Sequence, residues 1–315
     1  MPVDPRLQPI IDASAGAPPP DPSLTIAERR AAAHAGMELS FLAFSDPGPD
    51  PAAVTDHRVP VTGGEITVRV YRPHGDGPFP AHLYLHGGGF WIGALDHFDS
   101  SCRATVAGAG CLVASVDYRL APEHTFPTAP EDCFAALRWL LDHAADLEVD
   151  PSRVSVGGGS AGGNLSAVVA LMARDRGGPP LVFQVLEIPV TDLTMSQPSV
   201  EENAEGYVLT KRGMRQYTDY YLGPDGDPTD PYASPLLADD LSGLPPALVM
   251  TAEFDPLRDE GEAYGRRLQD AGVPTTIRRW DGQFHGSQNF AKLIPEAAAA
   301  YRDMVNAALR DAYAR

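Results

Sequence analysis

Ser160 lies at the centre of a G-x-S-x-G pattern that spans residues 158–162. A short apolar run at residues 153–156 precedes the pattern, and residues 160–175 follow it with the spacing of a helix. Such a sharp strand-to-helix turn exposes the serine hydroxyl at a helix N-terminus, and it requires glycine two residues away on each side. The pattern predicts that Ser160 is the nucleophile of an acyl-transfer reaction. A phosphate-binding loop is disfavoured, because no lysine follows at the required position and no acidic ribose partner is evident.

A cluster of glycines could stabilise the charge that develops in the same reaction. These glycines come directly after an apolar run at residues 81–85. A tetrahedral intermediate needs two or three backbone N–H groups aimed at one point, and glycine lets the backbone approach the substrate closely. We therefore assign an oxyanion hole to Gly88, Gly89 and Ala161, the last being the residue after the nucleophile. His86, just before the glycines, is expected to hold this loop in shape rather than to act as a base.

The general base must be a histidine that follows the nucleophile in the chain, because enzymes with this turn have the order serine, acid, histidine. Of the nine histidines, His285 alone follows Ser160. Asp255 comes just after an apolar run at residues 247–251, and we expect it to accept the imidazole Nδ1–H and stabilise the imidazolium. Three other acidic residues are weaker candidates for this role: Glu253, Asp259 and Asp281.

The elements around these residues alternate between strand and helix. Residues 58–61 and 65–71 flank Gly63-Gly64 and predict a β-hairpin. Alternation of strands and helices predicts a mostly parallel sheet covered on both faces, with its ligand site beyond the carboxyl ends of the strands. Thr128 and Glu131 have the spacing of a capping box. The further strands are predicted at residues 81–85, 111–116, 153–156, 182–188, 247–251 and 275–280, and the main helices at residues 26–44, 128–144, 160–175, 258–271 and 295–314.

Composition narrows the class of protein. The chain has 315 residues and a formal net charge of −18, which disfavours nucleic acid and anionic membrane surfaces as partners. It has three cysteines, each in an apolar stretch, and these are expected to be buried thiols rather than a disulfide framework. The N-terminal residues lack the apolar core of a secretory signal, and no stretch approaches 18 apolar residues. We therefore expect a cytoplasmic protein that does not insert into membranes.

Together these residues resemble the hormone-sensitive-lipase-like branch of the α/β-hydrolase superfamily. The resemblance implies an α/β-hydrolase fold and carboxylesterase activity, with no metal and no organic cofactor. It also implies a catalytic domain over residues 51–315 and a helical cap contributed by residues 1–50 and by an insertion at about residues 194–223. The motifs that carry it stand in order along the chain: H-G-G-G-F (86–90), D-Y-R-L-A-P-E-H (117–124), G-G-S-A-G-G-N (158–164), S-P-L (234–236), D-P-L-R-D-E-G (255–261) and H-G (285–286).

Two positions depart from the pattern of this branch. Gly159 stands immediately before the nucleophile, where the branch usually has Asp or Thr. Glu187 stands where the corresponding strand is usually apolar, just before Ile188-Pro189. The glutamate is expected either to lie on the surface at the end of the strand or to form a hydrogen bond near the site.

The substrate is less constrained than the reaction. Residues near the glycine loop and in the presumed cap either line a narrow apolar pocket for short- to medium-chain acyl esters or pack the cap itself. An amidase, lactonase or deacetylase could use the same triad, and a non-catalytic receptor for a small ligand could use the same fold. A homodimer through the edge strand near residues 275–280 is also expected. The pocket candidates are Phe90, Trp91, Leu209, Met214 and Tyr217.

Overall fold

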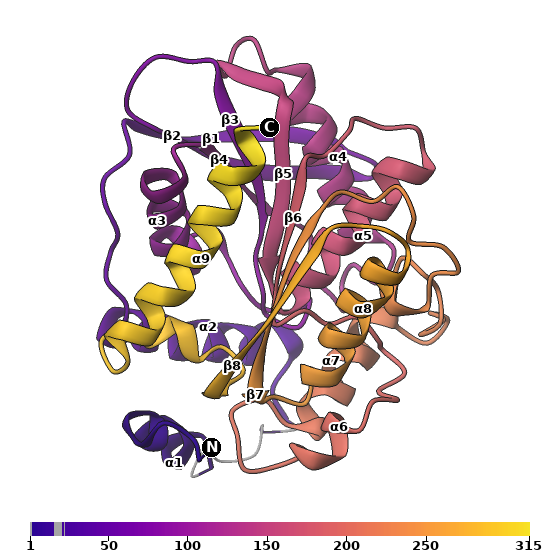
Figure 1. Ribbon diagram of the computed structural model, residues 1–315. Helices are drawn as coiled ribbons and strands as arrows, with labels where there is room; N and C mark the ends of the chain where they lie inside the picture. The colour runs from indigo at the N-terminus through magenta and orange to yellow at the C-terminus, as the bar shows by residue number, and fades with distance from the viewer. Residues whose placement is uncertain (1, 16–20, 22) are drawn as a thin grey trace.

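The computed structural model describes residues 2–15, 21 and 23–315, and its centre is one eight-stranded sheet with the order β1-β2-β4-β3-β5-β6-β7-β8 (Figure 1). β2 pairs antiparallel with both of its neighbours, whereas the pairs from β4 to β8 are all parallel. The mostly parallel α/β sheet predicted from the sequence is thus confirmed. The strands are β1 (Ala53–Val61), β2 (Gly64–Arg72), β3 (Phe79–Leu85), β4 (Leu112–Asp117), β5 (Val149–Gly159), β6 (Phe183–Glu187), β7 (Ala247–Phe254) and β8 (Thr275–Phe284).

Helices cover both faces of the sheet. In Figure 1, α3 and α9 lie on one face, α4, α5 and α8 lie on the other, and α2, α6 and α7 lie beyond the carboxyl ends of the strands. A parallel sheet needs this double cover, because its strands are apolar on both faces. The helices are α1 (Gln8–Ala15), α2 (Ile26–Phe44), α3 (Asp99–Ala109), α4 (Thr128–Asp142), α5 (Ala161–Asp175), α6 (Ser199–Glu202), α7 (Lys211–Leu222), α8 (Arg258–Asp270) and α9 (Pro295–Tyr313).

The alternation of side chains along β3 divides the core into two layers. Leu83 belongs to the cluster under α4 and α5, whereas its neighbour Tyr84 belongs to the cluster under α3 and α9. Leu83 is fully buried, and burial of such a side chain contributes about 1.5–3 kcal/mol to the free energy of unfolding. The three cysteines are free thiols buried in these layers, as expected.

Three local predictions need correction. The strand predicted to stop before Gly157 continues to Gly159, because these glycines pair with β6. The strand predicted at residues 275–280 continues to Phe284, which pairs with Phe254 after a shift in register. The predicted capping box is also wrong: Pro127 occupies the N-cap of α4 without a side-chain cap. Glu131 instead binds Arg176 through two hydrogen bonds of 2.7 and 2.8 Å, so a tertiary ion pair replaces the local cap.

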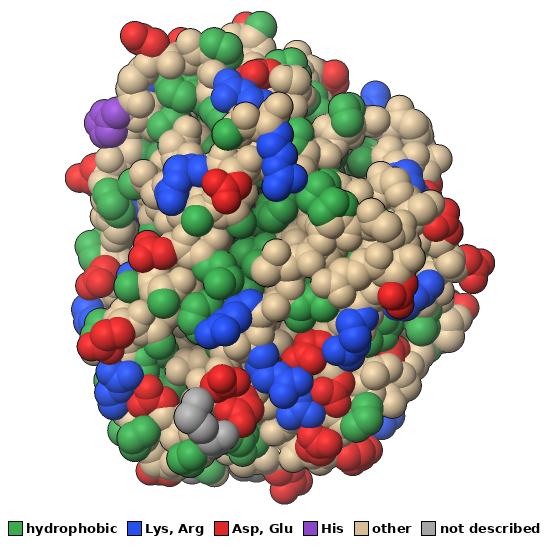
Figure 2. All heavy atoms as spheres, viewed as in Figure 1, with side chains coloured by type: hydrophobic (Ala, Val, Ile, Leu, Met, Phe, Trp, Pro, Cys, Tyr) green, Lys and Arg blue, Asp and Glu red, His purple; other side chains and the backbone are tan. Residues whose placement is uncertain are grey.

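The surface carries both signs of charge in spite of the acidic composition. On the face drawn in Figure 2, acidic and basic side chains are interspersed around a band of hydrophobic atoms. Among the helices of the described ranges, none is long and apolar enough to cross a bilayer.

Candidate active site

The turn between β5 and α5 holds Ser160 in a strained conformation. Its φ of 58° and ψ of −119° are unusual for a residue that carries a side chain. A Cβ atom added to Gly158 would lie 2.0 Å from the carbonyl oxygen of Leu85, and one added to Gly162 would lie 1.9 Å from the same atom. Both glycines of the pattern are therefore required by the approach of β3 as well as by crowding between strand and helix.

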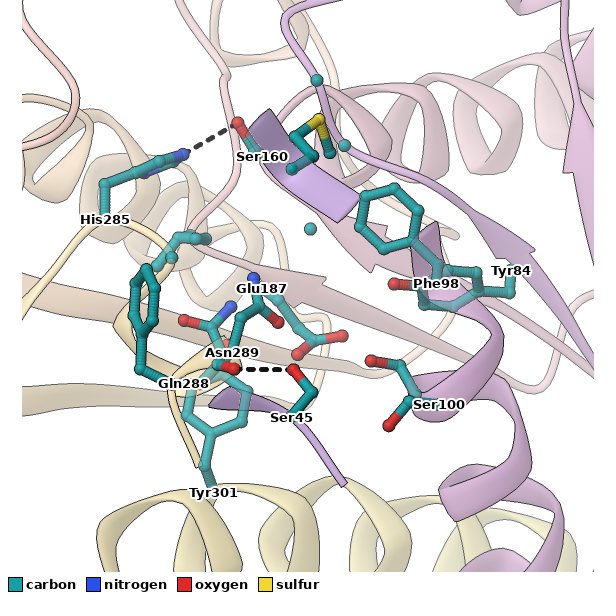
Figure 3. A pocket seen from close by; sticks show the side chains of 18 of the residues that line it. Ser45, Tyr84, Phe98, Ser100, Ser160, Glu187, His285, Gln288, Asn289 and Tyr301 are labelled. Carbon is teal, nitrogen blue, oxygen red and sulfur yellow. Dashed lines mark hydrogen bonds between the residues drawn. The ribbon is translucent and has the colours of Figure 1, made fainter. Parts of the chain in front are cut away.

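Residues that are far apart in the sequence meet at the carboxyl edge of the sheet. The hydroxyl of Ser160, at the end of β5, lies 3.0 Å from Nε2 of His285, which follows β8 (Figure 3). Nδ1 of the same imidazole lies 2.8 Å from Oδ2 of Asp255, which follows β7. The chain of hydroxyl, imidazole and carboxylate has the geometry of a proton relay for nucleophilic catalysis.

The competing carboxylates have other partners. Oε2 of Glu253 accepts the backbone N–H of Gly282 at 2.7 Å, and Asp281 is exposed. Asp259 forms an ion pair with Arg258. Asp255, by contrast, is fully buried, and its second oxygen accepts the N–H of Leu257 at 2.9 Å, which fixes the carboxylate toward the imidazole.

The glycine loop after β3 presents free backbone donors near the nucleophile. Gly88 and Gly89 have φ values of +126° and +57°, and a Cβ at Gly89 would lie 2.6 Å from the ring of Tyr217. Their N–H groups have no hydrogen-bond acceptor in the part of the chain that is described. The N–H of Ala161, in the first turn of α5, likewise has no acceptor within its helix. Three donors are thus available for a developing oxyanion.

His86 lies inside the loop and away from the reacting groups. Its ring is fully buried, stacks on Tyr118 with centroids 4.3 Å apart, and donates through Nδ1 to the carbonyl of Gly87 at 2.9 Å. Burial lowers the pKa of this imidazole to about 4, so it stays neutral. These contacts fit the role of a loop support.

Two residues of α2 also hold the glycine loop, and the sequence analysis did not identify them. Arg30 donates through Nε to the carbonyl of Trp91 at 2.7 Å and through a terminal nitrogen to the carbonyl of Ala121 at 2.8 Å. Nε2 of His34 accepts the N–H of Gly93 at 3.0 Å. No local pattern marks these residues, because their partners are about sixty and ninety positions away in the chain.

A cavity of about 870 Å³ lies beside Ser160. We call the part lined by residues of α7 and its neighbours the α7 arm, and the part lined by residues of α3, α9 and the nearby strand ends the α3–α9 arm. The α7 arm is apolar; of the predicted pocket residues, Phe90, Leu209, Met214 and Tyr217 line the cavity. Trp91 is not part of the cavity wall. Its ring packs against the rings of Tyr217 and Tyr220, with centroids 6.1 and 5.6 Å away. The wall of the α3–α9 arm includes both aromatic and polar side chains: Tyr84, Phe98, Ser100, Glu187 and Tyr301 (Figure 3).

Glu187 is therefore a residue of the cavity and not of the outer surface. Its carboxyl group lies in the α3–α9 arm, and burial raises its pKa to about 7. Of the two expectations for this residue, the structure favours a position near the site. Within the described ranges, no group of three or more His, Cys, Asp and Glu side chains is arranged to hold a metal ion.

Comparison with known proteins gives consistent results. The family model of the α/β hydrolase fold matches residues 82–289. The chain is 47% identical over 268 residues to the carboxylic ester hydrolase LipN of Mycobacterium tuberculosis, covering 83% of this chain and 71% of that protein. It is 48% identical over 245 residues to the carboxylesterase NlhH of the same species, covering 75% of each.

The structural comparison extends over nearly the whole chain. A hyperthermophilic esterase from the archaeon Pyrobaculum calidifontis superposes with a TM-score of 0.91 at 41% identity, covering 99% of each chain. An ester hydrolase from the metagenome of Lake Arreo, solved with a derivative of bipyridine phosphonate, also gives a TM-score of 0.91, at 38% identity over 99% of this chain and 100% of that one. On these grounds, the chain belongs to the α/β-hydrolase family, in its hormone-sensitive-lipase-like branch.

Proposed function

We propose that the protein hydrolyses carboxylic esters through an acyl-enzyme intermediate on Ser160. The observation that carries this proposal is the pair of contacts made by His285, 3.0 Å to the hydroxyl of Ser160 and 2.8 Å to the carboxylate of Asp255. The relatives that are named as esterases and carboxylesterases support the same reaction.

In this mechanism, the hydroxyl oxygen of Ser160 attacks the ester carbonyl carbon while Nε2 of His285 takes the hydroxyl proton. The N–H groups of Gly88, Gly89 and Ala161 stabilise the resulting oxyanion. The imidazolium, paired with Asp255, gives its proton to the departing alcohol. A water molecule then attacks the acyl enzyme by the same route, and Ser160 is regenerated.

The substrates are short- to medium-chain acyl esters. Three side chains that pack together bound the α7 arm: Leu209, Met214 and Leu257. Two segments form a cap over the site in this proposal: residues 1–50, of which 1, 16–20 and 22 lie outside the described residues, and an insertion at about residues 194–223. The remainder, within residues 51–315, is the catalytic domain. α2 and α7 each contribute residues to the cavity wall, which supports this division.

A panel of esters, amides and lactones separates the possible hydrolases. We expect turnover of p-nitrophenyl esters to be highest between C2 and about C8, because Leu209, Met214 and Leu257 pack together in the wall beside the nucleophile and limit the length of acyl chain that fits. Highest efficiency on C16 esters would contradict the chain-length proposal, and preferential hydrolysis of anilides or lactones would contradict the reaction class.

Labelling by a fluorophosphonate separates an enzyme from a ligand receptor on the same fold. The protein should take up one label per chain, at Ser160, because only an activated hydroxyl reacts rapidly with this reagent. The Ser160→Ala variant is the control and should remain unlabelled. Failure of the unmodified protein to react would contradict the proposal.

The protein forms a homodimer through β8 in this proposal. β8 is an outer strand of the sheet, and its residues from Thr275 to Trp280 are partly or fully exposed. An edge strand offers unpaired backbone groups to a second copy. Light scattering at micromolar concentration should give the mass of two chains, and a mass of one chain would remove this part of the proposal.

A further inference from the structure

The carboxyl group of Glu187 lies one strand away from the nucleophile and has no assigned role in the reaction. Glu187 is the last residue of β6, and its carbonyl accepts the N–H of Ser160 at 2.8 Å. Two residues earlier, Val185 belongs to the core layer under α3 and α9. Since side chains alternate along a strand, Glu187 points to the same face, into the α3–α9 arm.

The space beside the carboxyl group of Glu187 is open because the residue paired with it on the neighbouring strand is a glycine. Gly159 is the register partner of Glu187 on β5 and also lines the cavity. A Cβ added to Gly159 would lie 3.8 Å from the carbonyl oxygen of Glu187 and 3.9 Å from its Cβ. A larger side chain at position 159 would thus occupy room next to the glutamate. The two departures from the family pattern lie side by side and together leave a cavity that contains a carboxyl group.

The carboxyl group is not neutralised by the protein. Among the described residues, Glu187 forms no ion pair, and the hydroxyl of Tyr301 is the one side-chain group that lowers the pKa of its carboxyl group. Burial raises its pKa to about 7, and the neighbouring Tyr301 offsets only part of this rise. The hydroxyl of Tyr301 is itself buried without a hydrogen-bond partner. A carboxylate that is shielded from bulk solvent and has no cationic partner is costly, so a cationic ligand would gain from binding here.

Aromatic rings lie around the same arm. Tyr84 and Phe98, whose ring centroids are 6.2 Å apart, line it together with Tyr301. Burial raises the pKa of Tyr84 and of Tyr301, and the nearby charge of Glu187 raises both further, as expected for groups that lie close together. Aromatic faces attract ammonium groups, most strongly where water is excluded.

Two hydroxyls of this arm offer acceptors, whereas the side-chain amides of Gln288 and Asn289 can both donate and accept. The hydroxyl of Ser45 donates to the carbonyl of Asn289 at 2.9 Å (Figure 3). The hydroxyl of Ser100 donates to the carbonyl of Asp46. Both hydroxyls therefore have only lone pairs left for a ligand. The other charged residues of this part of the wall are Asp46, Arg302 and Asp303, so carboxylates outnumber the guanidinium.

We propose that Glu187 and the rings of Tyr84, Phe98 and Tyr301 form a subsite that binds the alkylammonium group of a cationic ester substrate. This inference rests on the proposed ester hydrolysis at Ser160. The α3–α9 arm holds the charged end of the substrate while the ester carbonyl lies at the nucleophile. Glu187 acts as a specificity residue, and bond making and breaking stay with Ser160 and His285.

The test compares esters that differ only in charge. Acetylcholine and 3,3-dimethylbutyl acetate have the same shape, and the first carries a quaternary ammonium on the alcohol side. The p-nitrophenyl esters of 4-(trimethylammonio)butanoate and 5,5-dimethylhexanoate form the matched pair for the acyl side. We expect kcat/KM to favour the cation in at least one pair, and Glu187→Gln to lower that ratio by about tenfold, the scale of a partly desolvated ammonium site.

Matched variants show whether a preference for cationic esters comes from Glu187 or from the overall negative charge of the protein. Asp303→Asn removes one carboxylate from the exposed part of the cavity wall and should keep most of the preference, as should Glu187→Asp, which retains the charge. Turnover of the neutral esters reports that each variant is folded. The subsite would be overturned if kcat/KM of the wild type for the cationic ester did not exceed that for its neutral partner in either pair. It would also be overturned if Glu187→Gln left this ratio unchanged. Ester hydrolysis at Ser160 would stand in both cases. Absence of turnover on every ester would overturn the proposed function and the subsite with it.

Discussion

The turn around Ser160 and the arm around Glu187 lie next to each other, yet they are built in opposite ways. At the turn, Gly158 and Gly162 approach the carbonyl of Leu85 so closely that neither could carry a Cβ. One position along, Gly159 has ordinary van der Waals room beside Glu187. Close packing holds the reacting hydroxyl at a fixed place, and vacant space next to it leaves room for part of a substrate.

The difference indicates how such a site can change its substrate without losing its chemistry. The hydroxyl, the imidazole and the oxyanion donors depend on backbone positions that tolerate almost no added volume. The arm depends on side chains at the end of a strand, where a glycine and a glutamate alter shape and charge without moving the backbone. Four experiments test this contrast between a rigid reacting centre and an adaptable arm.

Ser160→Ala should lower kcat for p-nitrophenyl acetate by about 10⁶-fold, because the members of a triad act as one unit. Steady-state kinetics on purified protein measures this loss, and circular dichroism checks that the fold is kept. Activity within tenfold of the wild type would mean that the strained turn has another purpose.

Asp255→Asn should lower kcat by about 10⁴-fold, because the amide no longer stabilises the imidazolium. Glu253→Gln is the matched control: its carboxylate accepts the N–H of Gly282 and does not contact His285, so kcat should stay within a few-fold. Equal losses in the two variants would place the acid elsewhere.

Gly162→Ala should reduce the free energy of unfolding by about 3 kcal/mol or more, because the new methyl group overlaps the carbonyl of Leu85. Gly159→Ala should cost less than about 1 kcal/mol, since its φ is not positive and its new contacts are at 3.8 Å or beyond. Urea unfolding of both variants measures the difference. Similar stability of the two would remove the contrast between the tight turn and the open arm.

The preference for acetylcholine over 3,3-dimethylbutyl acetate should rise roughly fivefold between pH 6 and pH 8, as the Glu187 carboxyl, whose pKa is about 7, becomes ionised. Below this pKa the group is neutral and loses its attraction for the cation. The quaternary ammonium does not titrate, and any effect of pH on the attack of Ser160 is common to both substrates and cancels in the ratio.

Other groups around Glu187 must be excluded as the source of this pH dependence. Tyr84 from β3 and Tyr301 from α9 have pKa values raised well above 10, so they stay neutral over the range. The charged side chains Asp46, Arg302 and Asp303 remain in the Glu187→Gln variant. In that variant, the preference for acetylcholine over 3,3-dimethylbutyl acetate should not change with pH. If it rose with pH as much as in the wild type, another group would be the cause.

Local patterns predicted much of the fold and of the candidate site. The alternation of strands and helices predicted the parallel sheet, because each period reflects a backbone conformation that nearby residues determine. The G-x-S-x-G pattern and the chain order of serine, acid and histidine singled out Ser160, Asp255 and His285, which the structure brings within hydrogen-bonding distance. Even here, the pairing of Gly159 with β6 and the extension of β8 to Phe284 depended on neighbouring strands.

The strand-to-helix turn, the glycine loop and the order of the reacting residues could therefore be read directly from local sequence patterns. Only the tertiary structure decided that Glu187 enters the cavity beside Gly159, that Arg30 and His34 of α2 support the glycine loop, and that Trp91 lies outside the cavity wall. The physical reason is that a local pattern specifies backbone conformation over a few residues. Which side chains meet across a sheet depends on strand order and on packing between segments far apart in the chain.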